Sequence, residues 1–217
     1  MNKNLIIAVD GTAASGKGSL ARNLAKHFKC AYLDTGKLYR LVGYIVIKEK
    51  IATQNIKLIE KKLKDYDFSK VNFENPKLKT ENVGKVASII ASYIEIRSIL
   101  LNYQREFASM NHKNKNGVIL DGRDIGTIVL PNADIKFFIN ASVAVRGERR
   151  WKELISLGQS IIKRNVLEEI RSRDERDSQR KNSPLIPASD AILLDTTNLS
   201  VNEVFLLAKK YVENYLN

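Results

Sequence analysis

Short apolar runs alternate with amphipathic stretches along the 217 residues of the chain. Apolar runs that end in a polar or glycine-rich turn are typical of buried strands, and they lie at Leu5–Val9, Ala31–Leu33, Gly117–Asp121, Ile135–Ile139 and Ala191–Asp195. Apolar residues at helical spacing predict helices at Ser19–Phe28 and at about 38–48, 82–111, 142–156, 163–179 and 200–215. The alternation predicts an α/β fold, a three-layer structure in which a parallel sheet carries helices on both faces.

The composition is that of an ordinary globular protein, with 44% hydrophobic and 28% charged residues. No apolar run reaches the length of about 18 residues that a membrane-spanning helix needs. The first apolar run ends in Asp10-Gly11, so we interpret it as a strand rather than a signal peptide. Cys30 is the only cysteine, which excludes an intrachain disulfide and a cysteine-based metal site and favours a reducing, cytoplasmic location.

The formal net charge of +12 leaves two interpretations open. A nucleic-acid-binding module would use such a charge. The lysines are scattered, however, as in Lys48-Glu49-Lys50, and no basic block is interleaved with aromatic residues. We therefore expect solvated lysines and arginines gathered around a phosphate-rich ligand, with neither nucleic acid nor a membrane as a partner. A steep salt dependence of RNA binding would indicate otherwise.

A glycine-rich turn with the spacing G-x-x-x-x-G-K-G-S follows the first predicted strand. It comprises Gly11, Thr12, Ala13, Ala14, Ser15, Gly16, Lys17, Gly18 and Ser19. Its glycines let backbone N–H groups turn toward phosphate oxygens, and Lys17 adds a cation for the β and γ phosphates. The pattern predicts an ATP-binding loop in which Ser19 ligates Mg²⁺ directly or through water. A plain strand-to-helix turn would not need a lysine and two further glycines at this spacing.

This loop alone does not identify a reaction, because GTPases, ATPases and small-molecule kinases share it. A GTPase would also need the base-reading motif N-K-x-D, whereas the stretch 114–117 reads N-K-N-G.

Two further motifs follow predicted strands, where ligands bind in open parallel sheets. The segment 34–40, D-T-G-K-L-Y-R, can hold a second anion at a helix start, although its first residues can equally be an ordinary N-cap. In the segment 121–126, D-G-R-D-I-G, Arg123 suits a phosphate and Asp124 suits an amino group. A surface Arg–Asp pair in a turn fits that segment as well.

The stretch from 146 to 180 holds eight arginines in a chain that otherwise prefers lysine. A salt-bridged exposed helix would explain pairs such as Arg173 and Asp177. The planar fork of arginine suits bidentate phosphate binding, however, and the change in usage favours a functional cluster.

Together these motifs resemble the bacterial cytidylate kinases, P-loop enzymes that phosphorylate CMP and dCMP with ATP and Mg²⁺. The resemblance covers nearly the whole chain. It is carried by the segments 10–19, 33–40, 79–105, 121–127, 173–185 and 190–197. The segment 33–40 follows the family pattern L-D-[ST]-G-A-x-Y-R, except that Lys37 replaces a small residue, and 121–127 follows D-G-R-D-[IM]-G-T.

The resemblance implies a role for each candidate residue. The expected catalytic residues are Lys17, Arg123, Arg173 and Arg176. The expected substrate-binding residues are Thr35, Tyr39, Arg40, Ser88, Arg97, Arg123, Asp124, Arg173, Asp177 and Arg180. Asp124 would accept a hydrogen bond from the N4 amino group that cytosine has and uracil lacks, and Arg97 would donate to N3 or O2. A kinase for another monophosphate, such as UMP, is the alternative.

The resemblance also implies a single P-loop kinase domain over residues 1–217. A monophosphate-binding insert is expected at about 38–85 and an arginine-rich lid at about 146–182. The part of the insert from 51 to 80 is rich in Lys, Asn and Asp, and we expect it to be helical or mixed. The sequence shows no obvious self-association surface, so we expect a monomer.

Overall fold

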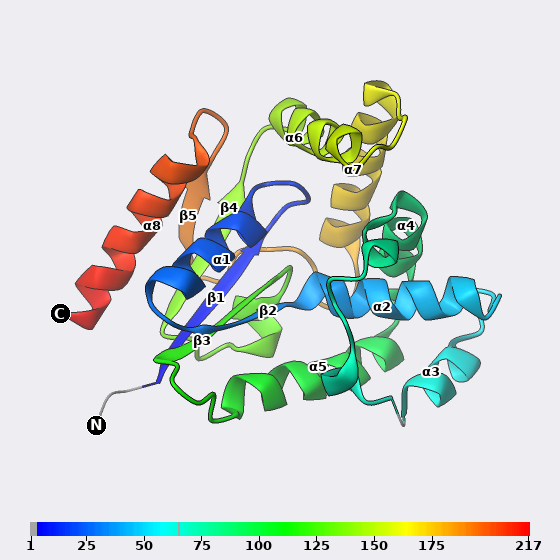
Figure 1. Ribbon diagram of the computed structural model, residues 1–217, viewed down its shortest axis with the longest axis horizontal. Coiled ribbons are helices and arrows are strands. Elements are labelled where there is room, and N and C mark those ends of the chain that lie inside the picture. The colour runs from blue at the N-terminus through cyan, green and yellow to red at the C-terminus, as the bar shows by residue number, and fades with distance from the viewer. Residues whose placement is uncertain (1–3, 65) are drawn as a thin grey trace. The chain divides into compact units, whose positions relative to one another are not determined.

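The computed structural model of the chain describes residues 4–64 and 66–217 and is shown in Figure 1. The chain divides into two compact units. The first comprises Met1–Leu33 and Asn111–Asn217, and the second comprises Asp34–Met110. The phosphate loop and the arginine-rich stretch belong to the first unit, and the motif at 34–40 belongs to the second. Each unit is described by itself.

The first unit is built on a parallel sheet of five strands in the described residues, in the order β2-β3-β1-β4-β5. The strands are β1 (Leu5–Gly11), β2 (Ala31–Asp34), β3 (Gly117–Gly122), β4 (Ile135–Asn140) and β5 (Ile192–Asp195). The central strand β1 pairs in parallel with both β3 and β4, and β4 pairs in parallel with β5. The predicted α/β class with a parallel sheet is therefore confirmed.

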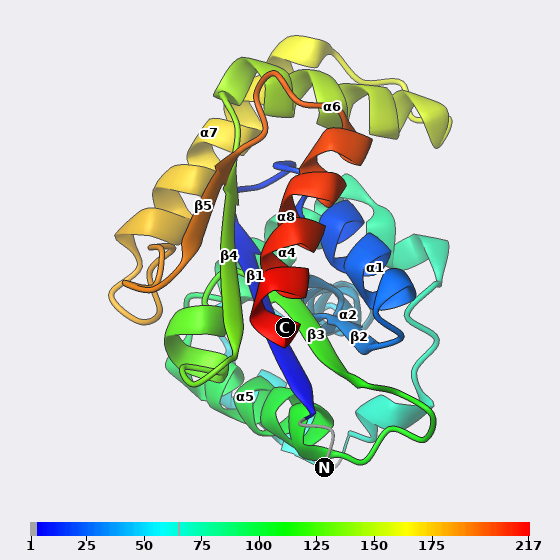
Figure 2. The ribbon, with the colours of Figure 1, turned by 90° about the vertical axis from the view of Figure 1, so that its left-hand side faces the viewer.

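Two helices of this unit, α1 (Lys17–His27) and α8 (Val201–Leu216), lie side by side against one face of the sheet (Figure 2). Their apolar faces pack with the strands into one core. Its fully buried side chains include Ile7, Leu24, Ile119, Phe137 and Val212. Burial of this apolar surface is the main force that holds β1 and α1 in place, and the phosphate loop connects them.

The arginine-rich stretch forms two packed helices, α6 (Val143–Ser156) and α7 (Lys163–Gln179), in agreement with their predicted positions. They share a small cluster of buried residues, Leu154, Val166 and Ile170, against which Ala14 of the phosphate loop also packs. A Cβ atom on Gly147 would lie 2.2 Å from Leu167 Cδ2, so only glycine permits this close approach of the two helices.

The second unit is helical in its described residues. Its elements are α2 (Thr35–Lys48), α3 (Ile56–Lys64), the 3₁₀ turns η1 (Phe68–Lys70) and η2 (Pro76–Lys79), α4 (Glu81–Ile90) and α5 (Ile94–Ser109). Helix α2 packs against α4 at Gly43, where a Cβ atom would come within 3.0 Å of the α4 backbone. The expected insert of 38–85 lies within this unit.

The single long helix expected over 82–111 is wrong, because the chain turns between α4 and α5. Tyr93 is extended, with φ −85° and ψ 124°, and the Ser92 hydroxyl donates to the carbonyl oxygen of Ile89. The guanidinium of Arg97 donates to the carbonyl oxygen of Ala91, the C-cap residue of α4, at 3.1 Å. A cation at a helix C-terminus is favourable. No proline or glycine lies at this break. The helical spacing of apolar residues therefore continues through it in the sequence, and the pattern predicts one helix.

Candidate active site

The phosphate loop connects β1 to the N-terminus of α1 and depends on glycine at two positions. Gly11 has φ 153° and its Cβ atom would lie 2.0 Å from the carbonyl oxygen of Ile139, while Gly16 has φ 92° in the left-handed region. Both positions favour glycine for steric reasons. Helix α1 begins at Lys17, without an acidic residue in its first turn, so its positive end faces the loop uncompensated. Lys17 Nζ lies 3.2 Å from the carbonyl oxygen of Thr12.

Side chains from α6 and from the end of β5 brace the back of this loop. The guanidinium of Arg146 donates to the carbonyl oxygens of Ala13, at 3.2 Å, and Ala141, at 2.7 Å. The hydroxyl of Thr196 donates to the carbonyl oxygen of Ser15 at 3.0 Å. These bonds occupy loop carbonyls. Of the loop N–H groups, that of Ala13 donates to the carboxylate of Asp174 on α7 at 3.4 Å, so this N–H group already faces an anion. The sequence marked Arg146 only as a member of the arginine-rich stretch.

Ser19, the predicted Mg²⁺ ligand, accepts a hydrogen bond from Arg22 Nη2 at 3.3 Å. Ser19 lies in the first turn of α1, next to Gly18, where a Cβ atom would be 3.3 Å from a carboxylate oxygen of Asp121. Asp121 ends β3 and also accepts a hydrogen bond from the Tyr32 hydroxyl at 3.0 Å. No group of three or more His, Cys, Asp or Glu side chains in the described residues could hold a metal by itself. A hydroxyl and a carboxylate are oxygen ligands of the kind that Mg²⁺ takes together with waters and substrate phosphates.

Four predicted substrate-binding residues of the first unit meet at one buried carboxylate. Asp177, on α7, accepts a hydrogen bond from Arg123 Nε at 3.0 Å, and Arg173 and Arg180 lie 3.9 and 3.8 Å from its oxygens. Arg123, Arg173, Asp177 and Arg180 are called the arginine cluster below. Burial favours the neutral acid, but the three guanidinium groups together hold the pKa of Asp177 below its usual value. The cluster therefore keeps one fixed negative charge among three positive ones.

Two other predicted residues of this unit lie differently. Arg176 donates to the hydroxyl of Ser172, one turn back on α7, rather than to Asp177. Asp124 is buried, 4% exposed, and directly precedes a short π-helical turn, η3 (Ile125–Val129), that the sequence did not predict.

The predicted residues of the second unit gather around the start of α2. Tyr39 and Arg97 are in contact, with the guanidinium carbon 5.4 Å from the ring centre. The guanidinium of Arg40 donates to the carbonyl oxygens of Leu78 and Thr80, and a Cβ atom on Gly84 would lie 2.9 Å from Arg40 Nη2. Thr35 and Ser88 are both buried.

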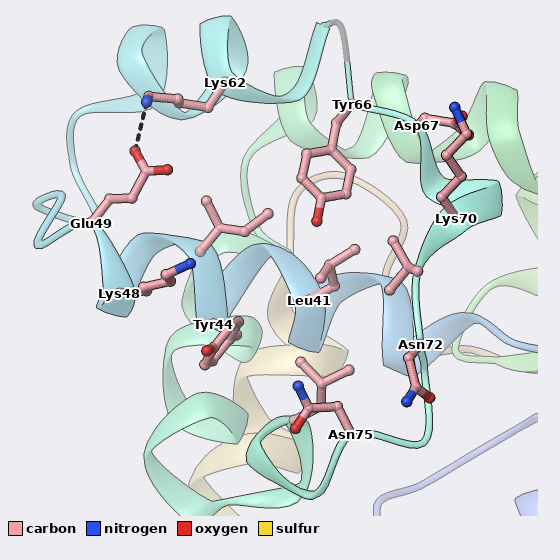
Figure 3. A pocket seen from close by; sticks show the side chains of 13 residues that line it. Leu41, Tyr44, Lys48, Glu49, Lys62, Tyr66, Asp67, Lys70, Asn72 and Asn75 are labelled. Atoms are coloured by element: carbon pink, nitrogen blue, oxygen red, sulfur yellow. Dashed lines mark ion pairs between the residues drawn. The ribbon is translucent and has the colours of Figure 1, made fainter.

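The second unit also contains a cavity of about 370 Å³ (Figure 3). Leu41, Tyr44, Lys48, Tyr66 and Asn72 are among the side chains that line it. None of the predicted substrate-binding residues lines it, so the cavity is separate from the predicted site. Its acidic side chains are engaged locally, since Glu49 pairs with Lys62 and Asp67 with Lys70.

Comparisons with known proteins agree with this description. The family model described as cytidylate kinase matches residues 7–214. A cytidylate kinase of Rhodospirillum rubrum is 44% identical over 204 residues, which cover 94% of this chain and 95% of that protein. A cytidylate kinase of Bartonella tribocorum is 43% identical over 211 residues, which cover 97% and 95% of the two chains.

Two solved structures share the fold at low sequence identity. An uncharacterized protein from Eubacterium ventriosum has a TM-score of 0.52 and 15% identity, covering 97% of this chain and 99% of that one. The shikimate kinase from Bacteroides thetaiotaomicron has a TM-score of 0.50 and 11% identity, covering 96% and 98%. These likenesses concern the fold alone, and they support the predicted P-loop kinase architecture. Each helix within residues 4–64 and 66–217 is too short or too polar to span a bilayer.

Proposed function

Because the chain belongs to the cytidylate kinase family, we propose that it transfers the terminal phosphoryl group of ATP to CMP or dCMP, giving ADP and CDP or dCDP. The observation that carries this proposal is the placement of two anion-binding groups in one compact unit. The phosphate loop offers backbone N–H groups and Lys17, and the arginine cluster offers guanidinium groups around Asp177. One suits the donor phosphates and the other the acceptor and the transferring group.

The reaction needs little covalent help from the protein. The phosphate of CMP is already anionic, so no strong general base is required, and catalysis rests on alignment and on neutralisation of charge. Lys17 and the loop N–H groups hold the donor phosphates. Ser19 and Asp121 would hold Mg²⁺, which would supply positive charge next to the donor phosphates.

The acceptor is held in this proposal by the predicted substrate-binding residues. Thr35, Tyr39, Arg40 and Arg123 bind the monophosphate. Ser88, Arg97 and Asp124 contact the cytosine ring. Asp124 accepts from the N4 amino group, while the carbonyl group of uracil at that position would meet a carboxylate. Discrimination between CMP and UMP follows from that repulsion.

Helices α6 and α7 serve as the lid in this proposal. Arg173 and Arg176 close over the transferring group and exclude water, which prevents hydrolysis of ATP without an acceptor. Arg173, Asp177 and Arg180 hold the ribose and phosphates. The monophosphate-binding insert is assigned to about 38–85 and the lid to about 146–182. The enzyme is expected to act as a monomer in the cytoplasm, with nucleotides rather than nucleic acids as its partners.

An assay of ADP release with a panel of acceptors tests the proposal. Purified protein with Mg²⁺ and ATP is given CMP, dCMP, UMP or AMP, and the nucleotide products are identified by chromatography. We expect CDP and dCDP as the main products and much slower turnover of UMP and AMP. Absence of CDP would refute the assignment, and faster turnover of UMP would replace it with a uridylate kinase.

A further inference from the structure

Asp10 ends the apolar part of β1, directly before Gly11, and carries a buried carboxylate that none of the roles above uses. It is 4% exposed. Its Oδ1 atom accepts a hydrogen bond from the backbone N–H of Ile125 at 2.7 Å, and its Oδ2 atom accepts one from Gly126, also at 2.7 Å. Hydrogen bonds from backbone N–H groups to an ionised carboxylate are among the stronger ones in proteins. Both oxygens are therefore committed to a segment more than a hundred positions away in the sequence.

These two N–H groups open the π-helical turn η3, directly after Arg123 and Asp124. An aspartate in the position of Asp124 commonly caps the turn that follows it. Here the side chain of Asp124 makes no capping bond, and its backbone has φ −145° and ψ 26°. Asp10 satisfies the first N–H groups of the turn instead. The backbone of the Arg123-Asp124 pair is thus fixed from outside its own segment.

Gly126, one of the two partners of Asp10, packs closely against Lys136. A Cβ atom at that position would lie 3.1 Å from Cδ of Lys136 and 3.4 Å from Oδ2 of Asp10. Lys136, on β4, is buried, and its Nζ atom donates to the carbonyl oxygen of Pro131 at 2.6 Å and to Asp190 at 2.9 Å. The lysine stem therefore closes the space beside Gly126, while its charge is directed to other partners.

We propose that Asp10 is a positioning residue that fixes the backbone of Arg123 and Asp124 relative to β1 and thereby sets acceptor affinity and the preference for CMP over UMP. The inference rests on the proposed function, in which Arg123 and Asp124 contact the acceptor. It adds a connection between β1 and the segment that carries Arg123 and Asp124.

The ionisation of Asp10 gives this connection a pH dependence. The pKa of Asp10 is raised to about 6: burial raises it most and the nearby charge of Asp124 also raises it, while the two N–H donors and Arg123 act in the opposite direction. Protonation places a hydrogen on one oxygen, which then accepts poorly from a backbone N–H group. Below about pH 6 one of the two bonds should therefore weaken, and acceptor binding with it.

The variant Asp10→Asn tests the proposal, because it keeps the shape but has only one acceptor oxygen. We expect the KM for CMP to rise about tenfold near neutral pH, as the loss of one bond to a charged group implies, with a smaller CMP-over-UMP preference. The dissociation constant of ATP should stay within about twofold of the wild-type value. Both hydrogen bonds of Asp10 go to η3 and neither goes to the phosphate loop. Comparable thermal unfolding of the two proteins establishes that the variant is folded.

A pH series separates this role from a merely structural one. The second ionisation of the CMP phosphate also falls near pH 6, but it is common to both proteins. The ratio of the variant KM to the wild-type KM therefore reports Asp10 alone. It should be about tenfold near neutral pH and approach one below about pH 6, where the wild-type carboxyl is itself protonated.

Lys136→Met is the matched control, because it removes a buried charge beside the same glycine but keeps the aliphatic stem. It should lower the temperature of unfolding and leave the KM for CMP and its pH dependence unchanged. If Asp10→Asn does not fold, Gly126→Ala disturbs the same contact from the other partner and should also raise the KM for CMP selectively.

Three results would overturn the inference. The first is a folded Asp10→Asn protein whose KM for CMP and CMP-over-UMP preference equal those of the wild type. The second is a parallel loss of ATP and CMP affinity, and the third is a KM ratio that does not change with pH. In each case wild-type turnover of CMP would leave the proposed function intact, whereas absence of CDP from the wild-type protein would refute both proposals.

Discussion

The phosphate loop and the arginine cluster both suit phosphate oxygens and both lie in the first unit, but they are built from different groups. The loop uses backbone N–H groups, which its glycines orient while Arg146 and Thr196 brace its carbonyls. The arginine cluster uses side chains arranged around the buried carboxylate of Asp177. The loop should therefore tolerate most side-chain changes, whereas the cluster should depend on each of its members.

Lys17 is the exception in the loop, and its replacement should have the largest effect. Lys17→Met keeps the length of the side chain but removes the cation that lies against the loop at Thr12. We expect kcat for CMP phosphorylation to fall about a thousandfold, equivalent to about 4 kcal/mol of transition-state stabilisation. Steady-state kinetics with CMP measure this, with circular dichroism to verify the fold. A variant that retained near-normal turnover would show that the loop acts through its backbone alone.

Asp177→Asn should have the next largest effect, because it leaves three guanidinium groups without their shared anion. We expect the free energy of unfolding to fall by about 3 kcal/mol, as for other broken buried ion pairs, and kcat/KM for CMP to fall about a hundredfold. Urea denaturation and steady-state kinetics measure the two effects. Arg164→Gln is the matched control, since its pair with Glu168 on the same helix is exposed.

The stability effect of Asp177→Asn should depend on pH in one direction. Burial opposes ionisation, but the guanidinium groups hold the folded-state pKa of Asp177 below its ordinary value of 3.8. The stabilising contribution of the carboxylate is therefore complete above that value and is lost as the pH falls through the lowered pKa. The stability difference between the two proteins should be constant near neutral pH and decrease only in strong acid. A difference that disappeared near neutral pH would contradict the ion-pair interpretation.

The same contrast explains what the sequence could reveal. The phosphate loop is a local motif whose spacing fixes its geometry, so nine consecutive residues were sufficient to predict it. The parallel sheet follows from the alternation of apolar runs and helices. The ties between distant segments have no such local signature. Asp10 looks like an ordinary residue at a strand end, and its partners Ile125 and Gly126 become apparent only when β1 and β3 are paired.

The second unit shows the limits of periodicity more clearly. The break between α4 and α5 depends on Arg97 donating to the carbonyl oxygen of Ala91, a contact that no helical pattern contains. In the first unit, the short turn η3 is held by a carboxylate from β1 rather than by its own residues. At both places tertiary contacts, rather than local helix propensity, determine the backbone conformation.

Asp124→Ala should change the selectivity for the acceptor and leave the KM for ATP unchanged. Removal of the carboxylate ends both the hydrogen bond proposed for the cytosine amino group and the repulsion of uracil. We expect the preference for CMP over UMP to fall about tenfold to a hundredfold, the range of one lost polar contact. The ratio of kcat/KM for the two acceptors measures this, and the KM for ATP is the internal control. An unchanged ratio would remove Asp124 from the base-reading role.

Thr12→Val should have the smallest effect and is the sharpest test of the backbone-built loop. The Thr12 hydroxyl donates to Asn140 Oδ1 at 2.8 Å in an exposed position, so valine removes a side-chain bond but leaves every N–H group of the loop in place. We expect the KM for ATP to change by less than about threefold, since an exposed hydrogen bond contributes only about 0.5 kcal/mol. Asn140→Ala removes the other partner and should behave alike. If either variant lost ATP binding, the orientation of the loop would depend on this side-chain pair, and the distinction between the two anion-binding regions would fail.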